Sequence, residues 1–106
     1  MAQIYTKRLC GPTLLTNAAD VTLFTVPTDH VYVVRSLLFW TNSGSCRYVL
    51  AIGTTLTVGN RVVNQTTAET DWRETRLELH AGESLHGLAS TSGGGYLTLT
   101  GYDFVD

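Results

Sequence analysis

The residues best suited to chemistry surround one turn near position 81. Glu78 and His80 lie two positions apart and so share a face of a strand, and Glu83 and His86 follow just past the turn. Zinc needs three or four such ligands converging at about 2 Å. Polar residues that flank an ordinary Ala-Gly-Glu turn are more often simply exposed to water. The sequence therefore favours an exposed turn, and we predict neither a metal site nor a cofactor.

Nucleophilic catalysis has little support in the chain. Asp29 and His30 could orient a nucleophile, but no serine stands in a Gly-x-Ser-x-Gly elbow. Cys46 alternates with Tyr48 and Leu50, which predicts a buried thiol and not a reactive one. The glycines at 93–95 lack the lysine and the following helix of a phosphate-binding loop. We predict no catalytic residues and a protein that is not an enzyme.

Aromatic side chains offer a different kind of site, because their rings stack on sugars and anchor interfaces. The candidates are Trp40, Tyr48, Trp72, Tyr96 and Tyr102. Trp40 belongs to the most apolar stretch, which favours the core or a subunit interface. Trp72, between Asp71 and Arg73, is predicted to be partly exposed and is where glycan binding would be sought first.

The stretch from Thr25 to Gly53 organises the chain. A turn at 27–30 with a favourably placed proline precedes a long strand at 31–41, and a turn at 42–45 leads into a strand at 46–52. Strict alternation puts Leu37 and Phe39 on one side of the long strand with Val31 and Val33. It puts Val34, Leu38 and Trp40 on the other side.

Both faces of this long strand are therefore apolar. Such a strand is either central in a stacked sheet or covered by a second molecule. We predict that one face meets the opposite sheet and the other meets a neighbouring molecule. The candidate interface residues are Leu37, Leu38, Phe39, Trp40 and Trp72.

Short strands recur about every 8–12 residues, separated by Gly, Asn, Asp and Ser, and this spacing is typical of a sandwich or barrel. Strands are predicted at 3–9, 21–26, 31–41, 46–52, 56–58, 61–63, 71–79, 84–89 and 96–104, and residues 13–16 are a candidate for a further short strand. A break is expected at 10–12, a two-residue turn at 59–60 and a polar loop at 65–69. The fold class is all-β: one antiparallel β-sandwich domain over residues 1–106, with about eight or nine strands. Jelly-roll-like and Ig-like topologies both remain open.

Composition points toward an assembly. The 106 residues are 43% hydrophobic and only 15% charged, so few side chains require exposure to solvent. The net charge is −2 and the seven basic residues are scattered, which argues against a nucleic-acid partner. The longest apolar run is far shorter than the ~20 residues of a membrane span. The N-terminus lacks a signal-peptide pattern, so synthesis in a cytoplasm is expected. Whether Cys10 and Cys46 pair stays open.

Five stretches of the chain carry a resemblance to a known family: Leu23-Phe24-Thr25-Val26-Pro27, Val31-Tyr32-Val33-Val34-Arg35-Ser36-Leu37, Trp40-Thr41-Asn42-Ser43-Gly44-Ser45, Leu79-His80-Ala81-Gly82-Glu83-Ser84-Leu85 and Leu97-Thr98-Leu99-Thr100-Gly101-Tyr102. These stretches resemble small accessory proteins of tailed-bacteriophage particles. The resemblance covers most of residues 21–102 and rests on structural motifs. Family members usually carry a glycine in the turn after Pro27, where this chain has Thr28-Asp29-His30, and residues 59–70 match no part of the pattern.

The resemblance implies a virion structural protein, a capsid-decoration or tail accessory type that docks on phage capsid or tail proteins. A homo-oligomer is expected, and cyclic symmetry, with a trimer as the candidate, would cover the apolar strand. Made in the host cytoplasm, the protein would reside in the virion. Two other functions stay open: a carbohydrate- or receptor-binding module using Trp72, and a metal-dependent enzyme using the four residues around position 81.

Overall fold

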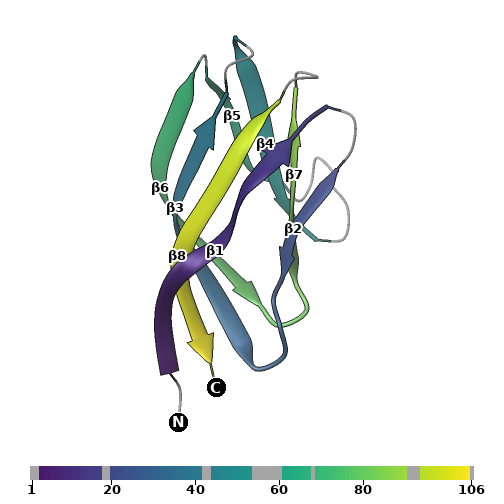
Figure 1. Cartoon of the computed structure of the whole chain (residues 1–106). Coiled ribbons are helices and arrows are strands. Elements are labelled where there is room, and N and C mark those ends of the chain that lie inside the picture. Colours follow the sequence, from purple (N-terminus) through teal and green to yellow (C-terminus); the bar gives the residue numbers. More distant parts are fainter. Residues whose placement is uncertain are drawn as a thin grey trace.

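Two antiparallel sheets pack face to face in the computed structural model, which describes residues 3–17, 20–41, 44–53, 61–67, 69–90 and 94–105 (Figure 1). The first sheet has the strand order β1-β8-β3-β6, formed by Gln3–Leu15, Gly95–Val105, His30–Trp40 and Thr70–His80. The second has the order β2-β7-β4-β5, formed by Val21–Thr25, Ser84–Ala89, Cys46–Ile52 and Arg61–Thr67. The prediction of an all-β antiparallel sandwich is confirmed.

The strand pairs are nested inside one another. β1 pairs with β8, β2 with β7, β3 with β6 and β4 with β5, so the chain resembles one long hairpin rolled into two layers. Two further pairs, β3 with β8 and β4 with β7, close the sheets. Eight strands in two sheets with this pairing form a jelly roll, which decides the topology that the sequence left open.

The core lies between the two sheets. Leu37 and Phe39 of β3 are fully buried, as are Tyr48 and Leu50 of β4. The Phe39 and Tyr48 rings stack with their centroids 4.4 Å apart and an interplanar angle of 23°. A fully buried side chain of this size contributes about 1.5–3 kcal/mol of hydrophobic free energy, so this central cluster ties the layers together.

An extra residue in β3 changes which side chains face the core. Val34 pairs with Gly101 of β8, but Ser36 pairs with Thr100, so Arg35 is the additional residue of a bulge. Tyr32 and Val34 face the core before the bulge, and Leu37 and Phe39 after it. The prediction that grouped Val34 with Leu38 and Trp40 is wrong, because strict alternation fails at Arg35.

Two boundaries also differ from the predictions. β1 runs through the expected break at 10–12, because two register shifts between Arg8 and Thr13 absorb the Gly-Pro pair within the strand. β5 continues to Thr67, so the loop predicted at 65–69 is wrong for its first three residues, which pair with β4 at the edge of the sheet. The strand predicted at 56–58 and the turn at 59–60 lie outside the described residues.

Candidate functional site

The four residues considered as metal ligands do not converge. His80 Nε2 lies 2.8 Å from Glu78 Oε2, and Glu83 Oε1 accepts a hydrogen bond of 2.6 Å from the His80 backbone N–H. His86 is buried in β7, where its Nδ1 lies 3.5 Å from an oxygen of Asp20. Within the described part of the chain, no three His, Cys, Asp or Glu residues form a metal-binding group. Glu83 closes its own turn, and His86 belongs to the other sheet.

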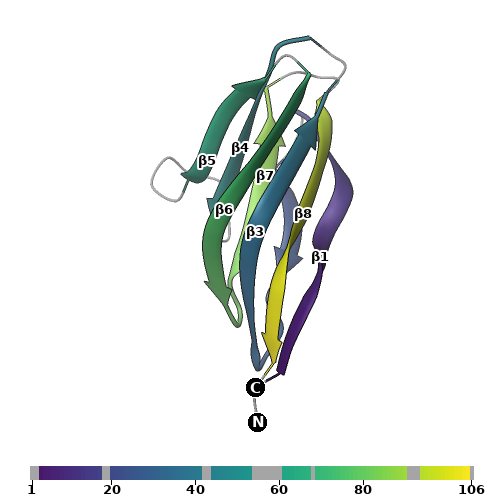
Figure 2. The ribbon, with the colours of Figure 1, turned by 90° about the vertical axis from the view of Figure 1, so that its left-hand side faces the viewer.

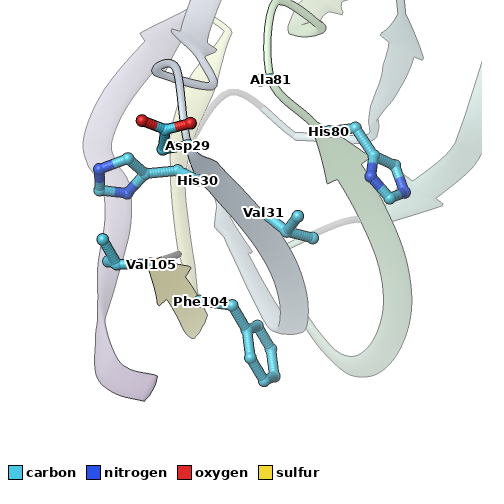
Figure 3. A pocket seen from close by; sticks show the side chains of 7 residues that line it. All are labelled: Asp29, His30, Val31, His80, Ala81, Phe104 and Val105. Atoms are coloured by element: carbon cyan, nitrogen blue, oxygen red, sulfur yellow. The ribbon is translucent and has the colours of Figure 1, made fainter. Parts of the chain in front are cut away.

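A hollow of about 390 Å³ opens at the end of the sandwich where the turns after β2 and β6 meet β8. It is lined by Asp29, His30, Val31, His80, Ala81, Phe104 and Val105 (Figure 3). The imidazoles of His30 and His80 point away from each other in this view. The hollow therefore does not combine its two histidines into an acid–base pair.

The buried carboxylate of Asp103 holds an ionic cluster that was not predicted. Its Oδ2 lies 2.9 Å from Lys7 Nζ, and its Oδ1 lies 2.7 Å from His30 Nδ1. Burial raises the pKa of Asp103, but the hydrogen bonds and charges of Lys7 and His30 outweigh it and bring the pKa below its usual value. His30 therefore pairs with a distant aspartate and not with its neighbour Asp29. The cluster joins β1, β8 and β3.

A second polar cluster links the two sheets. The Tyr48 hydroxyl donates a hydrogen bond to Asp71, and Arg73 Nε donates to the same carboxylate at 3.1 Å. Burial, followed by the neighbouring Asp71, raises the pKa of Tyr48 above its ordinary value. The sequence offered no signal for this contact, because Tyr48 lies in an apolar alternation that predicts core packing alone.

Cys10 and Cys46 are not joined in a disulfide. Cys46 is buried, as its alternation with Tyr48 and Leu50 predicts. Burial also raises the pKa of the Cys10 thiol, so its thiolate form is disfavoured.

The most prominent surface feature is an apolar area on the outer face of the first sheet, which we call the aromatic patch. It consists of Leu14, Leu38, Trp40, Trp72 and Tyr96, all exposed. Strand register brings them together: Tyr96 pairs with both Leu14 and Trp40, and Leu38 pairs with Trp72. The Trp40 and Tyr96 rings stack with centroids 6.2 Å apart. In Figure 2 the strands that carry the patch face the viewer.

No charged side chain interrupts these two rows of the sheet. The remaining outward positions of β6 and β8 in these rows are Thr70 and Thr98, and the next row holds Glu74, Ser36, Thr100 and the exposed Arg8 of β1. Exposed apolar areas rimmed by polar residues are typical of interaction sites. The patch is therefore suited to binding by burial of aromatic surface and not to bond-making chemistry.

The structure divides the five predicted interface residues. Leu37 and Phe39 are fully buried within the sandwich and are not available to another molecule. Leu38 and Trp40 are 40% and 43% exposed, and Trp72 is 63% exposed. Leu37 and Phe39 belong to the core because the bulge at Arg35 turns them inward. Leu38, Trp40 and Trp72 share the outer face of the sheet. Leu14 and Tyr96 were missed as interface candidates, although Tyr96 was considered for sugar stacking.

Comparisons with known proteins give a likeness of fold. No protein-family model and no curated protein matches the sequence. The structure of infectious bursal disease virus Gx strain matches with a TM-score of 0.53 and 12% identity. The crystal structure of the infectious bursal disease virus VP2 subviral particle matches with a TM-score of 0.54 and 13% identity. Each alignment covers 98% of this chain but only 32% and 33% of the respective viral chains.

This likeness shows the fold alone. The chain spans about a third of the length of those two viral chains. A similar fold therefore occurs within a larger chain of that virus.

Among the described residues, no helix is long and apolar enough to cross a membrane.

Proposed function

We propose that this protein is a non-enzymatic structural component of a tailed-bacteriophage virion, an accessory or decoration-type protein that self-associates and docks on capsid or tail subunits. The resemblance of residues 21–102 to phage accessory proteins supports the phage assignment. The jelly roll shared with a viral particle supports a structural role. The single observation that carries the proposal is the uncharged aromatic patch on one face of a chain that is only 15% charged.

The patch has the composition of a binding surface. Tryptophan and tyrosine bury about 150–250 Å² each and dominate the energetics of interfaces. Trp40, Trp72 and Tyr96 lie on neighbouring strands of one sheet, so a partner can cover all of them at once. Cyclic self-association, with a trimer as the expected form, would bury part of this surface. Many copies on a lattice then convert weak single contacts into firm attachment.

Substitution of the stacked pair tests this proposal. We expect Trp40→Ala combined with Tyr96→Ala to weaken self-association and binding to particles by at least about tenfold, because two aromatic anchors are removed. Sedimentation of the purified protein, alone and with phage particles, measures both effects. Val62→Ala is the matched control, since Val62 is also exposed but lies on β5 of the other sheet.

The control variant should behave as the unmodified protein does. A well-behaved monomer at micromolar concentration with no affinity for particles would contradict the proposal. Thermal unfolding of each variant separates loss of binding from loss of folding.

Carbohydrate or receptor binding by the same patch is a second candidate. The stacked Trp40 and Tyr96 rings beside Trp72 favour it, because exposed aromatic faces stack on sugar rings. A glycan array decides between the two functions. A signal that disappears in Trp72→Ala supports glycan binding, and no signal in the unmodified protein removes this candidate.

A further inference from the structure

The β6 strand leaves one side of the first sheet open. It pairs with β3 alone and lies at the edge of the sheet (Figure 2). The backbone N–H of Thr41 donates to Glu69 C=O, so the odd-numbered residues of β6 direct their backbone groups toward β3. The even-numbered residues Trp72, Glu74, Arg76 and Glu78 therefore direct theirs toward the open edge. Such an edge is a template for another strand.

This edge is long and regular in its side-chain alternation. β6 spans eleven residues without a proline, and its even-numbered positions are all exposed. Two oppositely charged residues, Glu74 and Arg76, flank the midpoint of the strand at Thr75. No ion pair or hydrogen bond to either side chain occurs within the described part of the chain. Both charges are available to a partner.

We propose that two copies of this chain pair antiparallel along β6, with the twofold axis at Thr75. In this register all eleven residues from Thr70 to His80 overlap. Glu74 then lies opposite the partner's Arg76, and Arg76 opposite the partner's Glu74. Opposite charges directly across an antiparallel pair are stabilising, and like charges are destabilising. The two first sheets join into one continuous sheet.

Charge selects this register over its neighbours. Backbone hydrogen bonding requires even-numbered residues to face even-numbered ones, so the strands can shift only in steps that keep this parity. Moving the axis to Glu74 sets two glutamates against each other. Moving it to Arg76 sets two arginines against each other and also opposes Glu74 to Glu78. A second copy of the same sequence carries the matching pattern, and it is the occupant that we propose for the edge.

This pairing uses the edge of the sheet and is separate from docking through the aromatic patch. The test uses the Trp40→Ala/Tyr96→Ala variant, in which association through the aromatic patch is weakened and β6 is unchanged. Dimers seen in this variant therefore report on pairing along the β6 edge, whatever the outcome for the patch. We expect a monomer–dimer equilibrium in sedimentation. Glu74→Arg or Arg76→Glu alone should weaken the dimer by about tenfold or more, because two attractive pairs become repulsive.

Two combinations should restore the dimer. The double swap Glu74→Arg/Arg76→Glu re-creates opposite charges across the axis. An equimolar mixture of the two single variants does the same, because one copy is then positive at both positions and the other negative. A structural defect would not be repaired by mixing. Absence of a dimer, indifference to the single swaps, or failure of both combinations would overturn the proposal.

Cross-linking tests the register independently. Facing residues that do not exchange backbone hydrogen bonds have Cα atoms about 4.5 Å apart, within the ~4.4–6.8 Å range of disulfides. Thr75→Cys, in a Cys10→Ser background, should therefore form a symmetric disulfide dimer under mild oxidation. Leu77→Cys is the matched control, because residue 77 lies opposite residue 77 of the second copy only if the twofold axis is at position 77. A cross-link through position 77 and not through 75 would overturn the register.

Discussion

Asp103 shows how far apart in the chain the members of one buried cluster can be. Its two oxygens bind Lys7 of β1 and His30, the first residue of β3. The sequence singled out His30 only for its neighbour Asp29. The true partner lies 73 positions away, and the contact exists only because β8 lies between β1 and β3. Side-chain pairs of this kind cannot be found without strand order.

Replacing Asp103 should lower stability in a pH-dependent way. The pKa of Asp103 is below its usual value in the folded chain, so the unfolded chain takes up this proton at higher pH. The carboxylate therefore stabilises the fold above the unfolded pKa of about 3.9, and this contribution is lost as pH falls through the folded pKa. We expect Asp103→Asn to cost about 3 kcal/mol at pH 7, because Lys7 and His30 lose their buried counter-charge.

Urea unfolding at pH 7 and pH 3 measures this difference. The difference in free energy of unfolding between the unmodified and Asp103→Asn proteins should be smaller at pH 3 than at pH 7. Lys7→Met serves as the control at pH 7: the Lys7 side chain is 42% exposed and His30 stays in place, so the loss should be smaller. If the difference in free energy of unfolding between Asp103→Asn and the unmodified protein were the same at pH 7 and pH 3, this pH linkage would be contradicted.

At the level of single strands, β3 and β8 fit together through the bulge at Arg35. A Cβ atom built on Gly101 would lie 1.9 Å from Val33 O and 3.0 Å from the Arg35 nitrogen. The extra residue therefore brings the β3 backbone so close to β8 that no side chain fits at position 101. Glycine is required here for close approach and not for an unusual backbone angle.

The close approach makes Gly101→Ala a sharp test of the bulge. We expect a loss of at least about 3 kcal/mol, because the new methyl group meets backbone atoms that cannot rotate away. Chemical denaturation provides the measurement. Thr98→Ala on the same strand, where the side chain is only partly buried, should cost much less. Equal stability of the two variants would show that the bulge can relax without cost.

Strands were predictable where composition and turns agree. β4 and β7 occupy the predicted ranges, and β2 ends one residue before its predicted limit, because each is an apolar run with clear turn residues on both sides. The range predicted for β5 is too short because the second half of this strand is polar. β5 is an edge strand that is held by backbone pairing to β4. The patch could be predicted only in part. Trp40 and Trp72 stood out by type, but Leu14 and Tyr96 join them through register alone.

On the scale of the whole molecule, the two outer faces differ in character. Nine large hydrophobic side chains are exposed among the described residues, and eight of them belong to strands of the first sheet. The exception is Val62 of β5. This asymmetry gives the molecule one face suited to association and another that is free of large apolar side chains apart from Val62, again counting described residues. A protein built this way can attach to a surface in a defined orientation.

Salt should separate the two proposed modes of association. Charge repulsion is screened over about 3 Å at 1 M salt, compared with about 10 Å at 0.1 M. The Arg76→Glu variant should therefore recover most of its edge-mediated dimer in 1 M NaCl. Association through the aromatic patch should persist or strengthen, because burial of apolar surface does not depend on charge. Sedimentation at both salt concentrations distinguishes them, and an Arg76→Glu defect that survives high salt would contradict an electrostatic origin.

The nested strand pairing has a consequence for the order of folding. Once β4 and β5 have met, each further pair closes only a short additional loop, whereas direct pairing of β1 with β8 closes nearly the whole chain at a larger entropic cost. We expect the structure to form from the innermost pair outward. The aromatic patch needs β1 and β8 in place and is therefore among the last surfaces completed. A newly made chain would then complete the aromatic patch only when it is already folded, so the association proposed for this patch would follow folding.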